Sequence, residues 1–122
     1  MKTSPHRNTS AIVDLKAIRN NIEKFKKHIH PNAEIWPAVK ADAYGHGSVT
    51  LAKTLLENGA DRLAVARLDE GLELRHQGII APIFILGYTN PVRASEAIAY
   101  GIDVCIFDYE QARLFSEIGR AH

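Results

Sequence analysis

Lys40 and Tyr44 are the two residues of this sequence whose types and spacing could carry chemistry. Lys40 follows Ala38-Val39 at the end of a short apolar run, whereas Lys53 and the other lysines fall on polar faces of predicted helices. If the run is a buried strand, Lys40 lies where α/β folds bind ligands. A lysine desolvated there loses basicity, and its neutral amine can form a Schiff base with an aldehyde or ketone. The alternative is a strand-end lysine whose amine reaches solvent.

Tyr44 lies in the loop Ala41 to Gly47, next to Gly45. Small residues let the backbone approach a ligand closely, and the tyrosine hydroxyl could then donate to a phosphate. The alternative is a half-buried aromatic lid. His46 could act as an acid or base, but a histidine in a turn is often structural, and we assign it no role.

The other polar candidates have structural explanations. His28 and His30 are two positions apart near a helix end, so their side chains diverge and a metal site is not expected. Cys105 lies in a predicted buried strand and is expected to be a small core residue. A later helix opens with three acidic residues that suit the helix dipole better than paired-carboxylate catalysis: Asp69, Glu70 and Glu73.

Strands and helices are predicted to alternate along the chain. Asp14 is a good N-cap for a helix over 15–29, and 35–39 is predicted as a strand despite Pro37. Asn90-Pro91 and Asp108 with Gln111 resemble helix starts, the second a capping box. The remaining predicted elements are helices at 48–57, 68–76, 92–100 and 108–118 and strands at 62–66, 83–86 and 103–107.

This alternation predicts an α/β fold. Each predicted strand is an unbroken apolar run, which favours parallel βαβ units whose sheet is covered on both faces. No strand is followed by a glycine-rich dinucleotide turn or a phosphate-binding P-loop. Two architectures remain: a small open sheet of about four strands, or about half of a TIM (β/α)8 barrel, which needs about 250 residues.

Composition narrows the classes of function. The chain has 122 residues, of which 46% are hydrophobic and 24% charged, which is typical of one globular domain and excludes disorder. A net charge of +1 argues against nucleic acid as a partner. A single cysteine fits a reducing compartment, so we expect a cytoplasmic protein, with no membrane-spanning run or secretory signal.

The string VKADAYGHG at 39–47 resembles the pyridoxal-phosphate attachment motif of bacterial alanine racemases. Asp14-Leu15, Ala17-Ile18 and Asn21 are similar to the family's opening pattern, and the stretches 63–75 and 82–87 resemble its next strands and helix. The resemblance implies about half of a TIM (β/α)8 barrel. It divides the chain into an N-terminal strand and helix segment at 1–33 and a partial barrel domain at 34–122, truncated before the fifth strand.

The resemblance also implies a chemistry. Lys40 would bind pyridoxal 5′-phosphate as a Schiff base, and Tyr44 would donate a hydrogen bond to its phosphate. The cofactor stabilises the carbanion left when alanine loses its α-proton, and the freed Lys40 amine acts as the base on one face. In the family, a tyrosine of the C-terminal domain, contributed across a homodimer interface, is the second base. The activity implied is interconversion of L-alanine and D-alanine, which supplies peptidoglycan synthesis.

Other functions remain open. We expect this chain to be an N-terminal fragment that is inactive alone, with a full-length parent that is an amino-acid racemase. A second hypothesis is a non-catalytic protein that carries pyridoxal phosphate on Lys40, and a third is a structural remnant without ligand. A broad-specificity racemase acting on serine is a further alternative.

Overall fold

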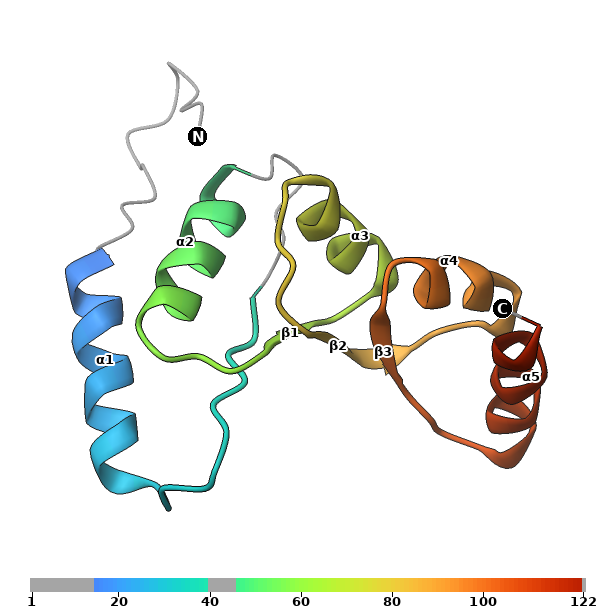
Figure 1. Ribbon diagram of the computed structural model, residues 1–122, viewed down its shortest axis with the longest axis horizontal. Helices are drawn as coiled ribbons and strands as arrows, with labels where there is room; N and C mark the ends of the chain where they lie inside the picture. The colour runs from blue at the N-terminus through green and yellow to red at the C-terminus, as the bar shows by residue number, and fades with distance from the viewer. Residues whose placement is uncertain (1–14, 40–45, 122) are drawn as a thin grey trace, which may run out of the picture.

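The computed structural model describes residues 15–39 and 46–121 (Figure 1). Helix α1 (Leu15–His28) lies beside α2 (His46–Glu57), and strands and helices then alternate. The following elements are β1 (Leu63–Val65), α3 (Leu68–His76), β2 (Ile83–Tyr88), the 3-10 turn η1 (Pro91–Arg93), α4 (Ala94–Ala99), β3 (Ile102–Cys105) and α5 (Tyr109–Arg120). The order confirms the predicted alternation, with boundaries that differ by a few residues.

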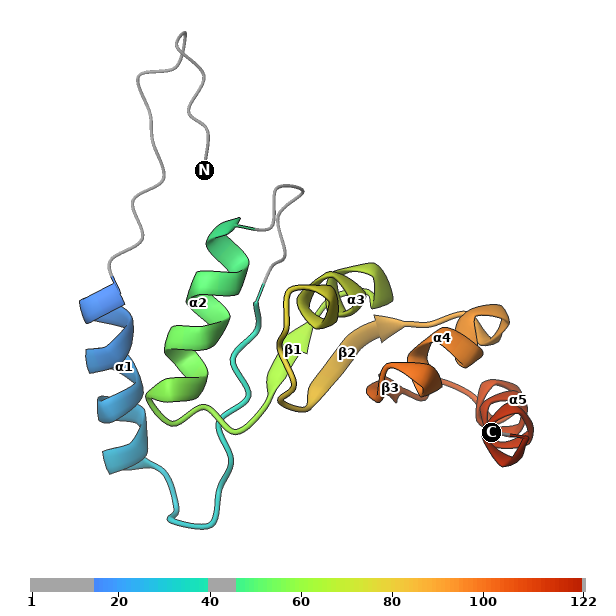
Figure 2. The ribbon, with the colours of Figure 1, turned by 45° about the horizontal axis from the view of Figure 1, so that its top comes forward.

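The strands form a parallel sheet in the order β1-β2-β3. Leu63 pairs with Ile83, which in turn pairs with Ile102. A helix links each pair of neighbouring strands, because parallel strands need a crossover connection. This arrangement confirms the predicted parallel βαβ units of the α/β class. In Figures 1 and 2 the helices follow the outside of an arc, and the strands lie on its inner side.

The segment predicted as the first strand, 35–39, forms a single parallel bridge between Ala38 and Ala64. Val39 N–H donates to the Ala64 carbonyl at 2.7 Å, and Ala64 N–H donates to the Pro37 carbonyl at 2.9 Å. Pro37 has no N–H, so it cannot complete the ladder toward β1. The prediction of four regular strands is therefore corrected, within the described residues, to three strands and a strand-like segment parallel to them.

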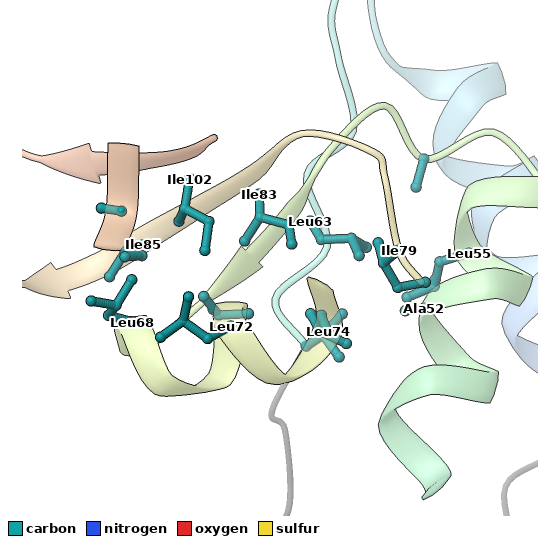
Figure 3. Packing of buried hydrophobic residues seen from close by; sticks show 14 of the residues in the cluster. Ala52, Leu55, Leu63, Leu68, Leu72, Leu74, Ile79, Ile83, Ile85 and Ile102 are labelled. Carbon is teal, nitrogen blue, oxygen red and sulfur yellow. The ribbon is translucent and has the colours of Figure 1, made fainter. Parts of the chain in front are cut away.

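The core lies between the sheet and the helices on its outer side. Figure 3 shows Leu68 and Leu72 of α3 facing the strands, and Leu74 at the end of the same helix near Ile79. Opposite them lie Ile83 and Ile85, which have no exposed surface. Burying side chains of this size against one another provides most of the favourable free energy of folding.

The inner face of the sheet differs from the prediction of two covered faces. Side chains alternate along a strand, and on β2 the alternation turns Leu86 and Tyr88 away from α3. Leu86 is 50% exposed and Tyr88 is 54% exposed. Within the part of the chain that the structure describes, helices cover only the outer face (Figure 1). The unbroken apolar run in β2 therefore includes residues of an open face.

Two predicted helix starts are confirmed by their side-chain caps. The Asn90 Oδ1 atom accepts a hydrogen bond from Val92 N–H at 3.0 Å, although the first turn is a 3-10 turn. The Asp108 Oδ1 atom accepts from Gln111 N–H at 2.7 Å. The predicted capping box at Asp108 is wrong in its second half, because the Gln111 side chain accepts from Phe107 N–H instead. The Gln111 amide also donates to carbonyls at the ends of β2 and β3.

The acidic start of α3 also acts as predicted. The Glu70 Oε1 atom accepts hydrogen bonds from the backbone N–H groups of Ala66 and Arg67, each at 2.9 Å. A carboxylate at this position satisfies unpaired donors and favours the positive end of the helix dipole. The Glu70 carboxylate is therefore part of the helix terminus, whereas Asp69 forms an ion pair with Arg93 at 2.7 Å.

Asp108→Ala is expected to lower the free energy of unfolding by about 1 kcal/mol, because α5 loses its N-cap acceptor. Asp108→Asn retains a side-chain oxygen and should remain within about 0.3 kcal/mol of the wild type. Urea denaturation of the two variants at one protein concentration measures the difference. Equal loss in both variants would show that the carboxylate charge, and not the cap, stabilises this terminus.

Candidate functional site

Lys40 and Tyr44 lie outside the described residues. The structure does describe the residue before Lys40: Val39 is 1% exposed and is hydrogen bonded to β1 through Ala64. Val39 is therefore buried at the end of the strand-like segment, whereas Trp36 and Ala38 of the same segment are exposed. Helix α2 begins at His46, so the predicted motif connects the end of this segment to the start of a helix.

The carboxyl ends of the parallel segments share one edge of the sheet. Because 35–39 runs parallel to β1, and β1 is parallel to β2 and β3, Val39 ends this segment at the same edge of the sheet as Ala66, Thr89 and Ile106. Ligands of parallel α/β folds bind at this edge, where the loops after several strands meet. The place of Lys40 at this edge and its chemical role both stay predictions.

Aromatic and aliphatic side chains line the inner face that leads to this edge. The Trp36 and Phe84 rings lie 5.5 Å apart between centroids, and the Tyr88 and Phe107 rings lie 6.1 Å apart. Leu86 lies on β2 between Phe84 and Tyr88 and is half-exposed. This apolar wall is suited to the face of a planar ring.

Gly87 allows two backbone segments to approach each other at the carboxyl edge. Its N–H donates to the Ala66 carbonyl at 3.1 Å, and a Cβ atom at Gly87 would lie 2.5 Å from that oxygen. Sequence reasoning did not single out this residue. The available signal was a glycine inside an apolar strand, which is typical of a close backbone approach.

Gln111 is a second residue whose role the sequence did not reveal. Its side chain is 1% exposed, and its Oε1 atom accepts from Phe107 N–H at 2.7 Å. Its Nε2 group donates to the carbonyls of Thr89 at 3.0 Å and Cys105 at 3.3 Å. The amide therefore joins the ends of β2 and β3 to the start of α5. The capping pattern located Gln111, but only the tertiary structure supplied its partners.

The charged groups on the described sheet gather at the opposite, amino end. The Arg62 guanidinium lies 4.9 Å from the centre of the Trp36 ring and forms ion pairs with Glu34 at 3.2 Å and Asp103 at 3.3 Å. These carboxylates are half-exposed or more, so each pair contributes little free energy. These charged groups are not part of the candidate site, because the sites of parallel α/β folds form at the carboxyl end.

The remaining polar candidates make local contacts. His28 Nδ1 lies 2.7 Å from the Lys24 carbonyl, and His30 Nδ1 accepts from Asn32 N–H at 3.0 Å. Cys105 is partly buried at the end of β3, so the prediction of a core residue holds in part. Within residues 15–39 and 46–121, no three metal-ligating side chains gather, and no helix is long and apolar enough to cross a bilayer.

An apolar cavity of about 500 Å³ lies away from the carboxyl edge. Residues of α1, α2 and the 35–38 segment line it, among them Phe25, Trp36 and Leu51. Among the described residues, no ionisable side chain lines the cavity, so these residues offer packing surface and no acid, base or nucleophile. It is therefore not the candidate site.

Comparison with known proteins gives concordant matches. The family model described as "Alanine racemase, N-terminal domain" matches residues 13–122. Alanine racemase of Lactococcus lactis subsp. lactis is 58% identical over 114 residues, which are 93% of this chain and 31% of that protein. The alanine racemase of Desulforamulus reducens is 44% identical over 110 residues, 90% of this chain and 30% of that protein.

Solved structures match the fold. Alanine racemase from Bacillus anthracis with bound L-Ala-P has a TM-score of 0.79 at 42% identity, over 90% of this chain and 28% of that one. Histidine racemase from Leuconostoc mesenteroides subsp. sake has a TM-score of 0.80 at 33% identity, and the match covers 97% of this chain and 31% of that one. These likenesses confirm the α/β architecture as the N-terminal part of a TIM-barrel domain. The chain spans 31% of the length of the Lactococcus relative.

Proposed function

The chain belongs to the alanine racemase family, and on that premise we propose that the protein acts in the pyridoxal-phosphate-dependent interconversion of L-alanine and D-alanine. The observations that support the proposal are the VKADAYGHG motif in the sequence and the parallel pairing of the segment before it with β1, through Ala38 and Ala64. The division into segments 1–33 and 34–122 remains part of this proposal.

The residues around the carboxyl edge fit pyridoxal 5′-phosphate. Lys40 provides the amine that an aldehyde requires, and Tyr44 provides a hydroxyl for a phosphate. The half-exposed side chain of Leu86 gives an apolar surface for the ring. When bound, the cofactor supplies an electron sink for the carbanion that forms when an amino acid loses its α-proton.

Lys40 has two roles in this proposal. Its amine holds the cofactor before substrate arrives, and once displaced it accepts the α-proton on one face of the substrate. The proposal requires the neutral form of this amine, because only that form can accept a proton. Racemisation needs a second proton donor on the other face. In the family this is a tyrosine of the C-terminal domain, so we propose that the active protein is a homodimer.

The substrate and the setting belong to the same proposal. Alanine is favoured because the named relatives at 58% and 44% identity are alanine racemases. Histidine is a second candidate substrate, because a histidine racemase covers 97% of this chain at a TM-score of 0.80. Serine is a third candidate, as the substrate of the broad-specificity racemase that the sequence leaves open. A cytoplasmic location fits the single cysteine, and the D-alanine formed would serve peptidoglycan synthesis.

Covalent trapping tests the proposal. The chain is incubated with pyridoxal phosphate, reduced with borohydride, digested and analysed by mass spectrometry. We expect the pyridoxyl group on Lys40 alone, because the motif at 39–47 assigns the Schiff base to that lysine. Labelling distributed over the exposed lysines of α1, which are Lys16, Lys24, Lys26 and Lys27, would contradict the assigned site.

Proton exchange separates the enzyme from a non-catalytic carrier. One base suffices to remove the α-proton of one alanine enantiomer and return deuterium from heavy water to the same face. These 122 residues alone are expected to be inactive as a racemase, so we expect deuterium incorporation with retention of configuration into that enantiomer, and racemisation only when the second base is supplied. Attachment on Lys40 without any exchange would favour the non-catalytic carrier.

A further inference from the structure

Two side chains bridge backbone groups of β2 and β3 at opposite ends of the sheet. At the amino end, the Arg75 guanidinium donates to carbonyls that precede each strand. Its acceptors are Ile79 at 2.9 Å, Ala81 at 2.6 Å, Tyr100 at 2.8 Å and Gly101 at 3.1 Å. Burial lowers the pKa of this guanidinium from its ordinary value, and the Asp103 carboxylate offsets part of the change. We call these contacts the Arg75 bridge.

At the carboxyl end, the Gln111 amide takes the corresponding position. Both hydrogens of Nε2 are used, one on the Thr89 carbonyl and one on the Cys105 carbonyl, and Oε1 accepts from Phe107 N–H. The Gln111 side chain is almost fully buried, with an exposed fraction of 1%. We call these contacts the Gln111 bridge. A buried amide with all of these partners fixes the relative position of the segments that it joins.

The Gln111 bridge determines how the inner wall ends. Thr89 directly follows Tyr88, and Phe107 lies two residues after Cys105. The backbone atoms that Gln111 holds therefore flank the Tyr88 and Phe107 rings, which meet at 6.1 Å. The two strands also lose regular register between Phe84 and Tyr88, so the ladder alone does not align their carboxyl ends.

We propose that Gln111 is a positioning residue for the ligand site at the carboxyl edge, whereas Arg75, which bridges the same strands at the amino end, is not. Gln111 acts through the ends of β2 and β3 and touches no reacting atom. This inference rests on the proposed function, because it takes the carboxyl edge to be the cofactor site. The division of roles follows from the fold, since loops at the carboxyl ends of parallel strands build the site.

A matched pair of variants tests the proposal in the 122-residue chain, namely Gln111→Met and Arg75→Met. Affinity for pyridoxal phosphate is measured by absorbance titration, and hydrogen exchange is followed by mass spectrometry in peptides from each end of β2 and β3. We expect Gln111→Met to raise Kd about tenfold, as for the loss of one to two net hydrogen bonds. Arg75→Met should change Kd less than about twofold, although it destabilises the fold.

Hydrogen exchange gives a readout that does not depend on the cofactor. Gln111→Met should speed exchange around Thr89 and Phe107 and leave the amino ends of the strands protected, and Arg75→Met should do the reverse. Equal increases of Kd in both variants, or an unchanged Kd in Gln111→Met, would overturn the positioning role. If the wild type binds no cofactor, the proposed function fails for this chain. Separately, faster hydrogen exchange at both the amino and the carboxyl ends of β2 and β3 in Gln111→Met would overturn the Gln111 bridge itself.

Gln111→Glu covers the case in which Gln111→Met does not fold. The glutamate keeps an oxygen for Phe107 N–H but has no donor for the Thr89 and Cys105 carbonyls when ionised. We expect faster exchange near Thr89 than near Phe107 in this variant, together with a raised Kd. A Kd and an exchange pattern equal to those of the wild type would overturn the proposal, because the strand ends would then not depend on the amide donors.

Discussion

Lys40→Ala is expected to abolish covalent attachment of pyridoxal phosphate, whereas Tyr44→Phe only weakens binding. The first substitution removes the amine that bonds to the aldehyde, and no other residue at the carboxyl edge is assigned that role. The second removes one hydrogen bond to a charged phosphate, which contributes roughly 1 to 3 kcal/mol. The borohydride adduct and the absorbance titration measure the two effects in parallel.

Lys53→Ala is the matched control for the lysine substitution. Lys53 is exposed on α2, only a short distance along the chain from the motif, and its amine has no assigned role. The adduct should form in this variant as in the wild type. Equal loss of attachment in the Lys40 and Tyr44 variants, or retention of the adduct in Lys40→Ala, would refute the roles assigned to these residues.

Gly87→Ala is expected to destabilise the fold by about 3 kcal/mol. The added Cβ would lie 2.5 Å from the Ala66 carbonyl oxygen, and a backbone atom cannot move aside as a side-chain end can. The strands must separate, and the hydrogen bond from Gly87 N–H to Ala66 at 3.1 Å is lost or lengthened. The free energy of unfolding from urea denaturation is the measurement, supported by hydrogen exchange at the ends of β1 and β2.

Gly119→Ala makes the same chemical change where there is space. Gly119 lies near the end of α5, and the nearest heavy atom to an added Cβ is Ile98 Cδ1 at 3.9 Å, an ordinary contact. Alanine is the better helix former by about 1 kcal/mol, so this variant should be as stable as the wild type or slightly more stable. Similar losses in the two variants would show that the contact between Gly87 and Ala66 is not the cause.

Local patterns predicted most of the elements. The apolar runs at 62–66, 83–86 and 103–107 lie on observed strands, and the caps at Asn90 and Asp108 start helical turns as expected. These features depend on neighbouring residues, whose spacing and side-chain chemistry are visible in the sequence. The segment 35–39 was predicted as a regular strand but forms a single bridge to β1. Its apolar composition did not reveal the hydrogen bond to β1 that Pro37 cannot donate.

The sequence predicts where the candidate site lies but not what surrounds it. The motif around Lys40 and the apolar run before it predict the amine at the carboxyl edge, and the pairing of Ala38 with Ala64 shows that this run is parallel to β1. The sequence pattern did not predict that Phe84, Leu86 and Tyr88 form an apolar wall on an open face of the sheet. An unbroken apolar run in a strand looks the same whether one face is open or both are buried.

The sequence by itself determined the α/β alternation, the helix termini and the motif that suggests Schiff-base chemistry at Lys40, because each arises from residues close together in the chain. The tertiary structure decided which face of β2 stays open, why position 87 is glycine and what the Gln111 amide holds. Gln111 and its acceptor Thr89 are 22 positions apart in the sequence. The close approach of Gly87 to Ala66 likewise joins residues from the ends of two different strands. Contacts of this kind follow from strand register and sheet curvature, which no local pattern specifies.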